Sequence, residues 1–301
     1  MTDPIQVLWT PAGLNLPSLG ARALVDVSDG DTPNIRMPIR MLSIDTPEVT
    51  ARSERGASII DAEFAELAQW MREGRAPVTA RFRDHVLPRI EGGDAGTRQW
   101  EQGQAASAFY KARTEERLAR PNSRRRRNLF LRSADQPFDR FGRLLAYVAP
   151  SYSAAEIREM TRAARATFNL DLVESGWAAP FVLFPSIPGE LDLPLFVEAA
   201  VGAMEAGRGQ YGDPLSLPAY EYRMLEKLYR ITRRIVRGES LSFADRIAWR
   251  SRYAIDLRTR TLYGPEDYMT VPQPYRIWVW PADVQRAIGM LNLVPAPSLV
   301  A

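Results

Sequence analysis

Apolar and polar residues alternate over several short stretches of the N-terminal half, a pattern that is typical of half-buried β-strands. We predict strands over residues 21–27, 39–44, 78–86, 129–131 and 144–148. The first of these strands ends at Ser28-Asp29-Gly30-Asp31, which predicts a turn. Asp139 to Arg143, with Gly142 inside it, predicts a second turn.

Elsewhere apolar residues recur every three or four positions, as on one face of an amphipathic helix. This spacing predicts helices over residues 60–71, 103–118, 154–175, 195–206, 218–237 and 281–291. Residues 207–217 contain three glycines and a proline and are interpreted as a linker. We therefore predict one domain over residues 17–209, with a large insertion at 49–102, and a mostly helical C-terminal appendage over residues 215–301.

The composition narrows the chemistry that is possible. The chain has 39 Lys and Arg against 36 Asp and Glu, and Arg, which suits bidentate phosphate contacts, dominates the basic side. It has no cysteine, which excludes thiolate chemistry and disulfides. His85 is its only histidine, so a histidine base acting with a histidine metal ligand is excluded. Catalysis would have to use carboxylates, arginines, hydroxyl groups and a metal.

No stretch approaches the roughly 18 uninterrupted apolar residues of a membrane-spanning segment. Residues 1–16 carry an acid and two prolines where a signal peptide would have basic residues and an apolar run. We therefore expect a cytoplasmic protein without a membrane partner.

Three acids stand near the ends of the first two predicted strands. Asp31 follows the turn at Gly30, while Asp45 and Glu48 flank Pro47 at the end of the second strand. If the strands pair, the three carboxylates converge, which is costly unless a cation neutralises them. Hard divalent ions such as Ca²⁺ or Mg²⁺ take carboxylate, carbonyl and water oxygens, so these acids predict a metal site.

Two arginines complete this set. Arg40 lies five residues before Asp45, and Arg143 follows the turn at Gly142. A metal ion and two guanidinium groups can stabilise the charge on a five-coordinate phosphorus, and a spare carboxylate can deprotonate water. The set therefore predicts hydrolysis of phosphodiester bonds.

The same residues stand in motifs that resemble those of the thermonuclease (staphylococcal nuclease-like) family. In order, these motifs are Asp29-Gly30-Asp31-Thr32, the stretch from Arg40 to Asp45-Thr46-Pro47-Glu48, Gln104 to Phe109, Asp139 to Tyr147, and Asn169 to Ala178. The resemblance covers about residues 21–209 and does not reach the C-terminal third.

The resemblance implies an α+β fold with a mainly β core, a five-stranded OB-type barrel with flanking helices. It also implies a nuclease that cleaves DNA and RNA and leaves 3′-phosphate ends. Asp31, Asp45 and the carbonyl of Thr46 would bind Ca²⁺, with Mg²⁺ or Mn²⁺ as alternatives. Glu48 would be the general base, and Arg40 and Arg143 would hold the scissile phosphate.

The chain departs from the family pattern at several places. Some 54 residues separate Glu48 from Gly103, where the family has a short loop, and Phe141 stands where many relatives have tyrosine. Two other functions stay open: a catalytically silent barrel that only binds nucleic acid, and a module that recruits a protein partner through residues 49–102 or 215–301.

Overall fold

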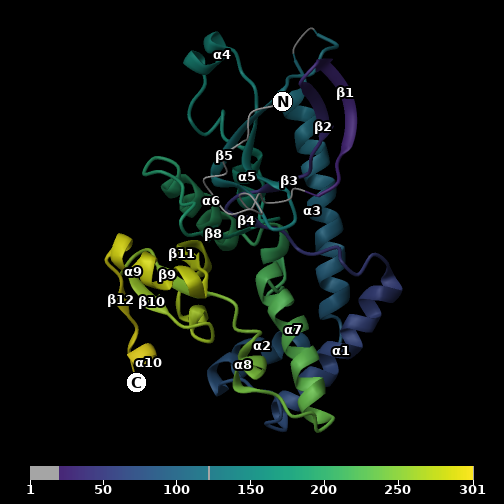
Figure 1. The fold of residues 1–301 in the computed structure, drawn as a ribbon, viewed down its shortest axis with the longest axis vertical. Helices are drawn as coiled ribbons and strands as arrows, with labels where there is room; N and C mark the ends of the chain where they lie inside the picture. Colours follow the sequence, from purple (N-terminus) through teal and green to yellow (C-terminus); the bar gives the residue numbers. More distant parts are fainter. Residues whose placement is uncertain (1–19, 121–122, 301) are drawn as a thin grey trace, which may run out of the picture. The chain divides into compact units, whose positions relative to one another are not determined.

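The computed structural model of the chain describes residues 20–120 and 123–300 (Figure 1). The N-terminal segment that was considered for a signal peptide lies outside the described residues. The chain forms two compact units. Unit 1 consists of Met1–Arg40 and Ser133–Ala146, and unit 2 of Met41–Arg132 and Tyr147–Ala301. Each unit is described by itself.

Unit 1 contains a β-hairpin. Strands β1 (Ala23–Asp29) and β2 (Thr32–Arg36) pair antiparallel, and the register brings Asp29 opposite Thr32. Gly30 and Asp31 are therefore the two residues of the hairpin turn, as glycine and aspartate often are. The predicted turn at Asp29-Gly30-Asp31 is confirmed.

The chain crosses between the units within three short strands. These are β3 (Ile39–Met41), β5 (Leu129–Phe138) and β6 (Leu144–Pro150), which form one sheet in the order β3-β6-β5. Each strand begins in one unit and ends in the other.

Helices make up most of unit 2. Helix α1 (Glu54–Arg72) contacts α2 (Ala80–Ile90), α3 (Ala95–Leu118) and α7 (Ala219–Val236), as Figure 1 shows. The main core lies between these helices. In it the rings of Trp70 and Tyr229 stack with their centroids 5.6 Å apart, and Phe64 meets Tyr222 edge-on at 5.3 Å. Such aromatic pairs add packing energy beyond the area that they bury.

The remaining elements of unit 2 are short. The helices are α4 (Ala154–Glu159), α5 (Phe168–Glu174), α6 (Leu193–Glu205), α8 (Phe243–Ile247), α9 (Val284–Leu291) and α10 (Pro297–Val300). Five strands form one sheet in the order β12 (Val294–Pro295), β10 (Thr261–Tyr263), β9 (Tyr253–Asp256), β11 (Arg276–Val279) and β8 (Val182–Leu183). Strands β4 (Ile44–Asp45) and β7 (Ala179–Pro180) form a separate antiparallel pair.

The predicted OB-type barrel with a mainly β core is wrong. Among the described residues helix (46%) outweighs strand (19%), and the strands form small open sheets with no closed barrel. The C-terminal part, predicted to be mostly helical, also carries four of the five strands of the largest sheet, which lie beyond residue 215. The strands in question have only two to four residues, too few to show a clear alternation of apolar and polar positions.

The predicted strand over residues 78–86 is wrong as well, because this segment is helix α2. The side chain of Thr79 accepts a hydrogen bond from the backbone N–H of Phe82 and so caps the helix. Phe82, Val86 and Ile90 are fully buried and follow one another at intervals of four residues. The apolar residues of this segment have the spacing of a helix, but the β-branched residues at its start favoured a strand in the prediction.

The other helix predictions hold with shifted ends, except that residues 154–175 form two helices, α4 and α5, instead of one. Elements on both sides of residues 207–217 belong to unit 2, and the predicted division into 17–209 and 215–301 stays a prediction. In the described part of the chain, no helix combines the length and the apolar character that crossing a membrane requires.

Candidate functional site

The six residues predicted for the site are divided between the two units. Asp31, Arg40 and Arg143 belong to unit 1, while Asp45, Thr46 and Glu48 belong to unit 2. The strands that carry the acids do not pair with each other as expected: β1 pairs with β2, and β4 pairs with β7.

In unit 1 the turn at residues 139–143 fixes the side chain of Arg143. Asp139 accepts hydrogen bonds from the backbone N–H groups of Phe141 and Arg143, at 2.9 and 3.0 Å, and from Arg143 Nε at 2.7 Å. Gly142 has a φ of +70°, which glycine adopts without strain. The guanidinium of Arg143 also lies 5.4 Å from the centre of the exposed Phe141 ring. The turn therefore presents an oriented arginine.

Electrostatics supports the same pairing. Burial raises the pKa of Asp139, but the hydrogen bonds from Arg143 and Phe141 lower this pKa by more, so that the net shift is downward. Asp139 is thus held as the carboxylate that Arg143 requires. Asp31 occupies the hairpin turn, where Thr32 Oγ1 donates to Asp31 Oδ1 at 3.2 Å, and Arg40 lies in β3.

In unit 2, Asp45 and Glu48 share one guanidinium group. Asp45 is the last residue of β4, and its side chain is fully buried. Arg223, from helix α7, donates through Nη2 to Asp45 Oδ2 at 2.7 Å and through Nη1 to Glu48 Oε1. The structure therefore brings these two predicted acids together, on a basic residue that comes from the C-terminal part of the chain.

Helix α3 holds the backbone around Glu48 in place. Gly103 lies so close to this segment that a Cβ atom on it would meet the carbonyl oxygens of Glu48 and Pro47 at 2.8 and 2.9 Å. One turn earlier the buried amide of Gln99, oriented so that both its ends are paired, accepts from the backbone N–H of Glu48 and donates to the carbonyl of Leu217, each at 2.9 Å. A side chain at position 103 would displace Glu48.

The charges around Glu48 are of both signs. Burial lowers the pKa of Arg223, but Asp45 and Glu48 raise it by more, so that Arg223 stays charged. Glu226, one turn further along α7, has a raised pKa because it is partly buried and because Glu48 and Glu63 repel its charge. Arg223 is thus a shared partner of Asp45 and Glu48, while the charges of Arg230 and Arg223 both lower the pKa of Glu226.

A second arginine, Arg252, lies near this pair. Its side chain is buried, and its guanidinium lies 5.0, 5.8 and 5.5 Å from the ring centres of Phe181, Trp278 and Trp280. Burial and the charge of Arg223 lower the pKa of Arg252 to about 10, and the charge of Asp45 offsets part of this lowering. Arg252 is therefore still charged at neutral pH.

Sequence reasoning missed both arginines as partners of the acids. Arg223 lies on the helix predicted over residues 218–237, and neither it nor Arg252 was among the predicted site residues. Arg223 stands 178 residues from Asp45, so no local spacing could indicate the contact. One sign was present: Arg223 interrupts the apolar run formed by Tyr222, Met224 and Leu225, which are buried.

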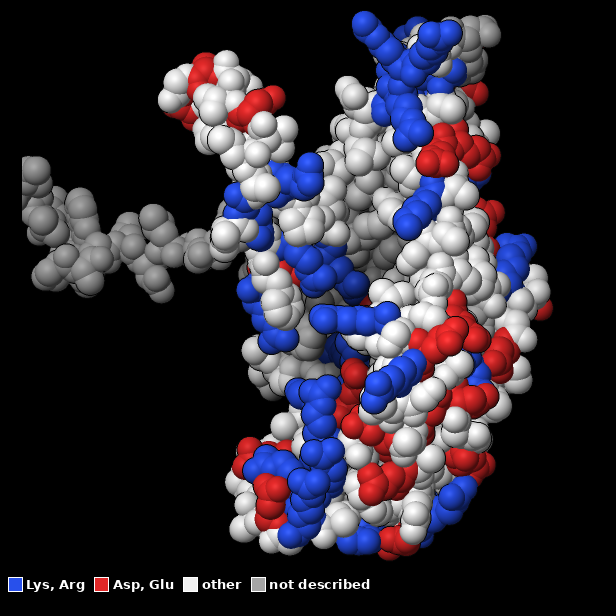
Figure 2. Space-filling view, turned by 90° about the vertical axis from the view of Figure 1, so that its right-hand side faces the viewer, with Lys and Arg blue, Asp and Glu red and all other residues white. Residues whose placement is uncertain are grey.

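Two other basic residues of α7 are also engaged within unit 2. Lys227 donates to the carbonyl of Ala248 at 2.9 Å, and Arg234 pairs with Glu239 at 2.7 Å. In Figure 2, acidic side chains stand beside basic ones over the lower half of the molecule, where α1, α2, α7 and α8 lie. This face is therefore not a uniformly basic surface.

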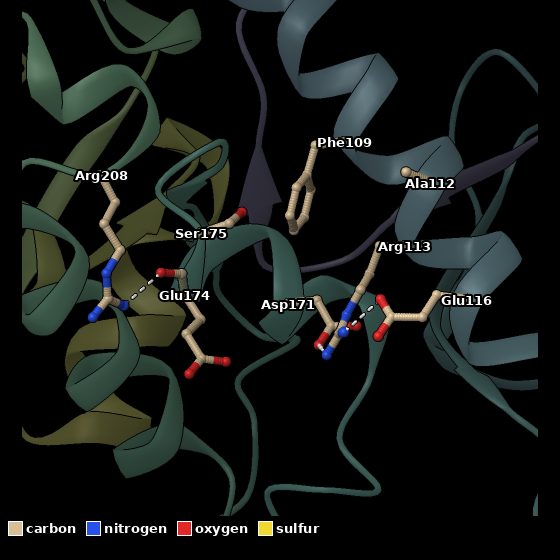
Figure 3. A pocket seen from close by; sticks show the side chains of 8 residues that line it. All are labelled: Phe109, Ala112, Arg113, Glu116, Asp171, Glu174, Ser175 and Arg208. Atoms are coloured by element: carbon tan, nitrogen blue, oxygen red, sulfur yellow. Dashed lines mark hydrogen bonds and ion pairs between the residues drawn. The ribbon is translucent and has the colours of Figure 1, made fainter.

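Unit 2 also has a cavity of about 660 Å³ between α3, α5 and the segment at Arg208 (Figure 3). Arg113 lies between Asp171 and Glu116, with hydrogen bonds of 3.3 and 2.8 Å. Arg208 donates to the carbonyl of Glu174 at 3.0 Å. Because Arg113 is paired with Asp171 and Glu116 within the wall, we do not assign the site to this cavity.

Residues 20–120 and 123–300 contain no group of three or more His, Cys, Asp or Glu residues arranged to hold a metal ion. No protein-family model matches the chain, and no curated protein matches it.

Proposed function

We propose that this protein is a metal-dependent nuclease that hydrolyses phosphodiester bonds of DNA, RNA or both. The proposal is carried by the convergence of Asp45 and Glu48 on Arg223. Two carboxylates and a guanidinium, of which Glu48 and Arg223 are 22% and 33% exposed, form a charged group that solvent can reach. General-base catalysis and phosphate binding both need such groups.

Glu48 is the general base in this proposal. Glu48 is paired with Arg223, and a carboxylate is the form that accepts a proton from water. The water oxygen then bonds to phosphorus, and the bond from phosphorus to the 5′ oxygen breaks. The leaving oxygen takes a proton from solvent, which yields a 3′-phosphate and a free 5′-hydroxyl group.

Arg223 holds the phosphate in the same scheme. A guanidinium has five N–H donors, and the contacts with Asp45 and Glu48 use one on each of Nη1 and Nη2. The remaining donors can bind phosphate oxygens and stabilise the charge that develops on them. The roles of Asp31, Arg40 and Arg143 are proposed from the sequence motifs alone.

The oxygen donors of this site fit a hard divalent cation. Asp45, and the Thr46 carbonyl that the motif assigns, are ligands of the kind that Ca²⁺, Mg²⁺ and Mn²⁺ take. Two ligands are fewer than such an ion needs, so water and phosphate oxygens would supply the rest in this proposal. A bound ion would neutralise charge on the phosphate and acidify a water molecule.

The test is degradation of plasmid DNA and of RNA with Ca²⁺, Mg²⁺, Mn²⁺ or EDTA. We expect metal-dependent cleavage that falls about 100-fold or more in Glu48→Gln. The matched control is Glu101→Gln, which removes one exposed acid from α3 and should leave the rate unchanged. Equal cleavage by Glu48→Gln and wild type would reject Glu48 as the base.

One observation favours a second function, a module that binds nucleic acid without cleaving it. Glu48 already has a cationic partner, and this contact must loosen before the carboxylate can approach a water molecule. A silent module would retain a labelled oligonucleotide and release no fragments with any of the three metals. The same assay therefore distinguishes the two functions.

A further inference from the structure

Arg252 is a buried cation without a carboxylate partner. It directly precedes β9, and its residue is only 6% exposed. No hydrogen bond or ion pair joins its guanidinium to any residue that the structure describes, and Arg252 Nε is buried without an acceptor. Its close neighbours are the aromatic rings of Phe181, Trp278 and Trp280.

Such an arrangement is costly for the free protein. Burying a charge loses its hydration, and the faces of aromatic rings compensate only part of this loss. Proteins retain unsatisfied buried groups mainly where a ligand or a reaction uses them. Trp278 Nε1, on one of the three rings, is likewise buried without an acceptor. Two donors in one cluster thus lack the acceptor that an anion would provide.

The position of Arg252 connects it to the site described above. Arg252 lies over Phe181, which directly follows β7, and β7 pairs with the strand that carries Asp45. The charges of Arg223 and Asp45 both act on Arg252. Glu226 lies one turn along α7 from Arg223, and its charge and that of Glu63 repel anions. An anion that approaches this region is therefore attracted to the side of Arg252.

Trp280 indicates which kind of anion fits. It lies 5.5 Å from the Arg252 guanidinium, yet it is 41% exposed, unlike Phe181 and Trp278. An exposed indole beside a phosphate-binding arginine matches the way in which single strands bind, with bases stacked on aromatic rings and phosphates on basic groups. A free phosphate ion would use the arginine but not the ring.

We propose that Arg252 and Trp280 form a subsite for one nucleotide of a single-stranded nucleic acid, with its phosphate on Arg252 and its base on Trp280. This subsite rests on the proposed nuclease function and extends it, because it assigns substrate binding to the C-terminal sheet. The rings hold the guanidinium in place, so little side-chain freedom is lost when the strand binds.

The experiment measures binding of a short fluorescein-labelled single-stranded oligodeoxynucleotide to the full chain by fluorescence anisotropy in EDTA. We expect Arg252→Met to weaken binding at least about tenfold and to reduce the slope of log affinity against log salt by about 0.7. Trp280→Ala should weaken binding about fivefold or more. Inorganic phosphate at millimolar concentration should compete with the strand in wild type.

Arg286→Met is the matched control. Arg286 is exposed and also lies over an aromatic ring, that of Phe184 at 5.6 Å, so this change removes the same charge and a similar contact. Arg286→Met should bind the oligonucleotide with an affinity within about twofold of wild type, because single exposed charges generally contribute little. Equal affinities of Arg252→Met and Arg286→Met would overturn the subsite, and so would binding of phosphate without binding of the strand.

Thermal unfolding separates binding from a structural role. An arginine kept for a ligand is not needed by the free protein, so Arg252→Met should unfold at the same temperature as wild type or higher. A marked fall in this temperature would contradict the proposal. The role of Arg252 would then be structural, and Arg252→Lys, which keeps the charge, would bind as weakly as Arg252→Met. A strand that binds through Arg252 but is never cleaved would reject the nuclease and leave the subsite standing.

Discussion

Arg223 on helix α7 donates a hydrogen bond of 2.7 Å to Asp45, which precedes it by 178 residues and is itself fully buried. The same guanidinium pairs with Glu48. A buried carboxylate at the end of a short strand is thus stabilised by a helix from the distant C-terminal part of the chain. The stability of this region and the proposed chemistry therefore share one contact.

Replacing Arg223 with methionine should destabilise the fold by about 2–3 kcal/mol, because the buried Asp45 would lose the hydrogen bond of 2.7 Å from this guanidinium. The estimate lies at the low end for buried pairs because the Arg223 side chain is 33% exposed. Urea unfolding followed by circular dichroism measures the change. The double variant Asp45→Asn/Arg223→Met should recover part of the loss. A loss equal to the sum of the single changes would show that the two residues are not coupled.

Glu226→Gln should stabilise the protein at neutral pH, by up to about 1 kcal/mol for a partly solvated group. Burial and the charges of Glu48 and Glu63 raise the pKa of Glu226 above its ordinary 4.5 in the folded state. The folded chain therefore binds this proton more tightly than the unfolded chain, and this residue's contribution to stability falls as the pH rises from 4.5 through the folded pKa.

The variant and wild type should accordingly become equal in stability as the pH falls below about 4.5, where Glu226 is protonated in both states. Urea midpoints measured from pH 4 to pH 8 would follow this convergence. A constant difference across the range would mean that ionisation of Glu226 is not its cause.

Gly103→Ala should cost about 1–3 kcal/mol and should reduce nuclease activity, because the new Cβ would press on the backbone of Pro47 and Glu48. Gly202→Ala is a suitable control. Gly202 lies within helix α6, and nothing lies within 4 Å of a Cβ at this position. The control should gain about 0.5–1 kcal/mol, as alanine does in place of glycine in a helix. If both variants were equally stable, the close approach of α3 to Glu48 would be disproved.

Asp139→Asn should lower nuclease activity about tenfold or more while costing about 1–2 kcal/mol of stability, because it weakens the three hydrogen bonds that hold the turn and Arg143. Arg140→Gln, a neighbouring change at an exposed arginine that also lies over Phe141, should have little effect. Comparison of kcat and KM for the two variants tests this. Unaltered kinetics in Asp139→Asn would remove the positioning role of Asp139.

The sequence predicted individual elements better than it predicted their assembly. The hairpin turn at Gly30 and Asp31 and the helix α7 were found because turn residues and a helical apolar period are local signals. The closed barrel was wrong because closure depends on which strands pair, and strands of two or three residues such as β4 and β7 carry almost no pattern. The strand predicted over residues 78–86 was wrong for a different reason. The helical spacing of its apolar residues was outweighed by the β-branched residues at its start, which favour strands.

The candidate site was predicted in part for the same reason. Asp45 and Glu48 stand three residues apart on either side of Pro47, so their proximity could be expected. Their partner Arg223 could not, because a contact over 178 positions depends on how α7 packs against α1. Arg252 becomes noticeable only through its burial among aromatic rings, which the sequence does not encode at any fixed spacing.

Helix α7 supplies Arg223, so shortened versions of this protein need careful design. A clone that stops before residue 219 would lose the guanidinium that neutralises Asp45, and it would leave β8 without β11 alongside it. Such a fragment would be inactive or insoluble whatever the C-terminal region contributes to substrate binding. Single substitutions in the intact polypeptide are therefore the better way to assign roles to this region.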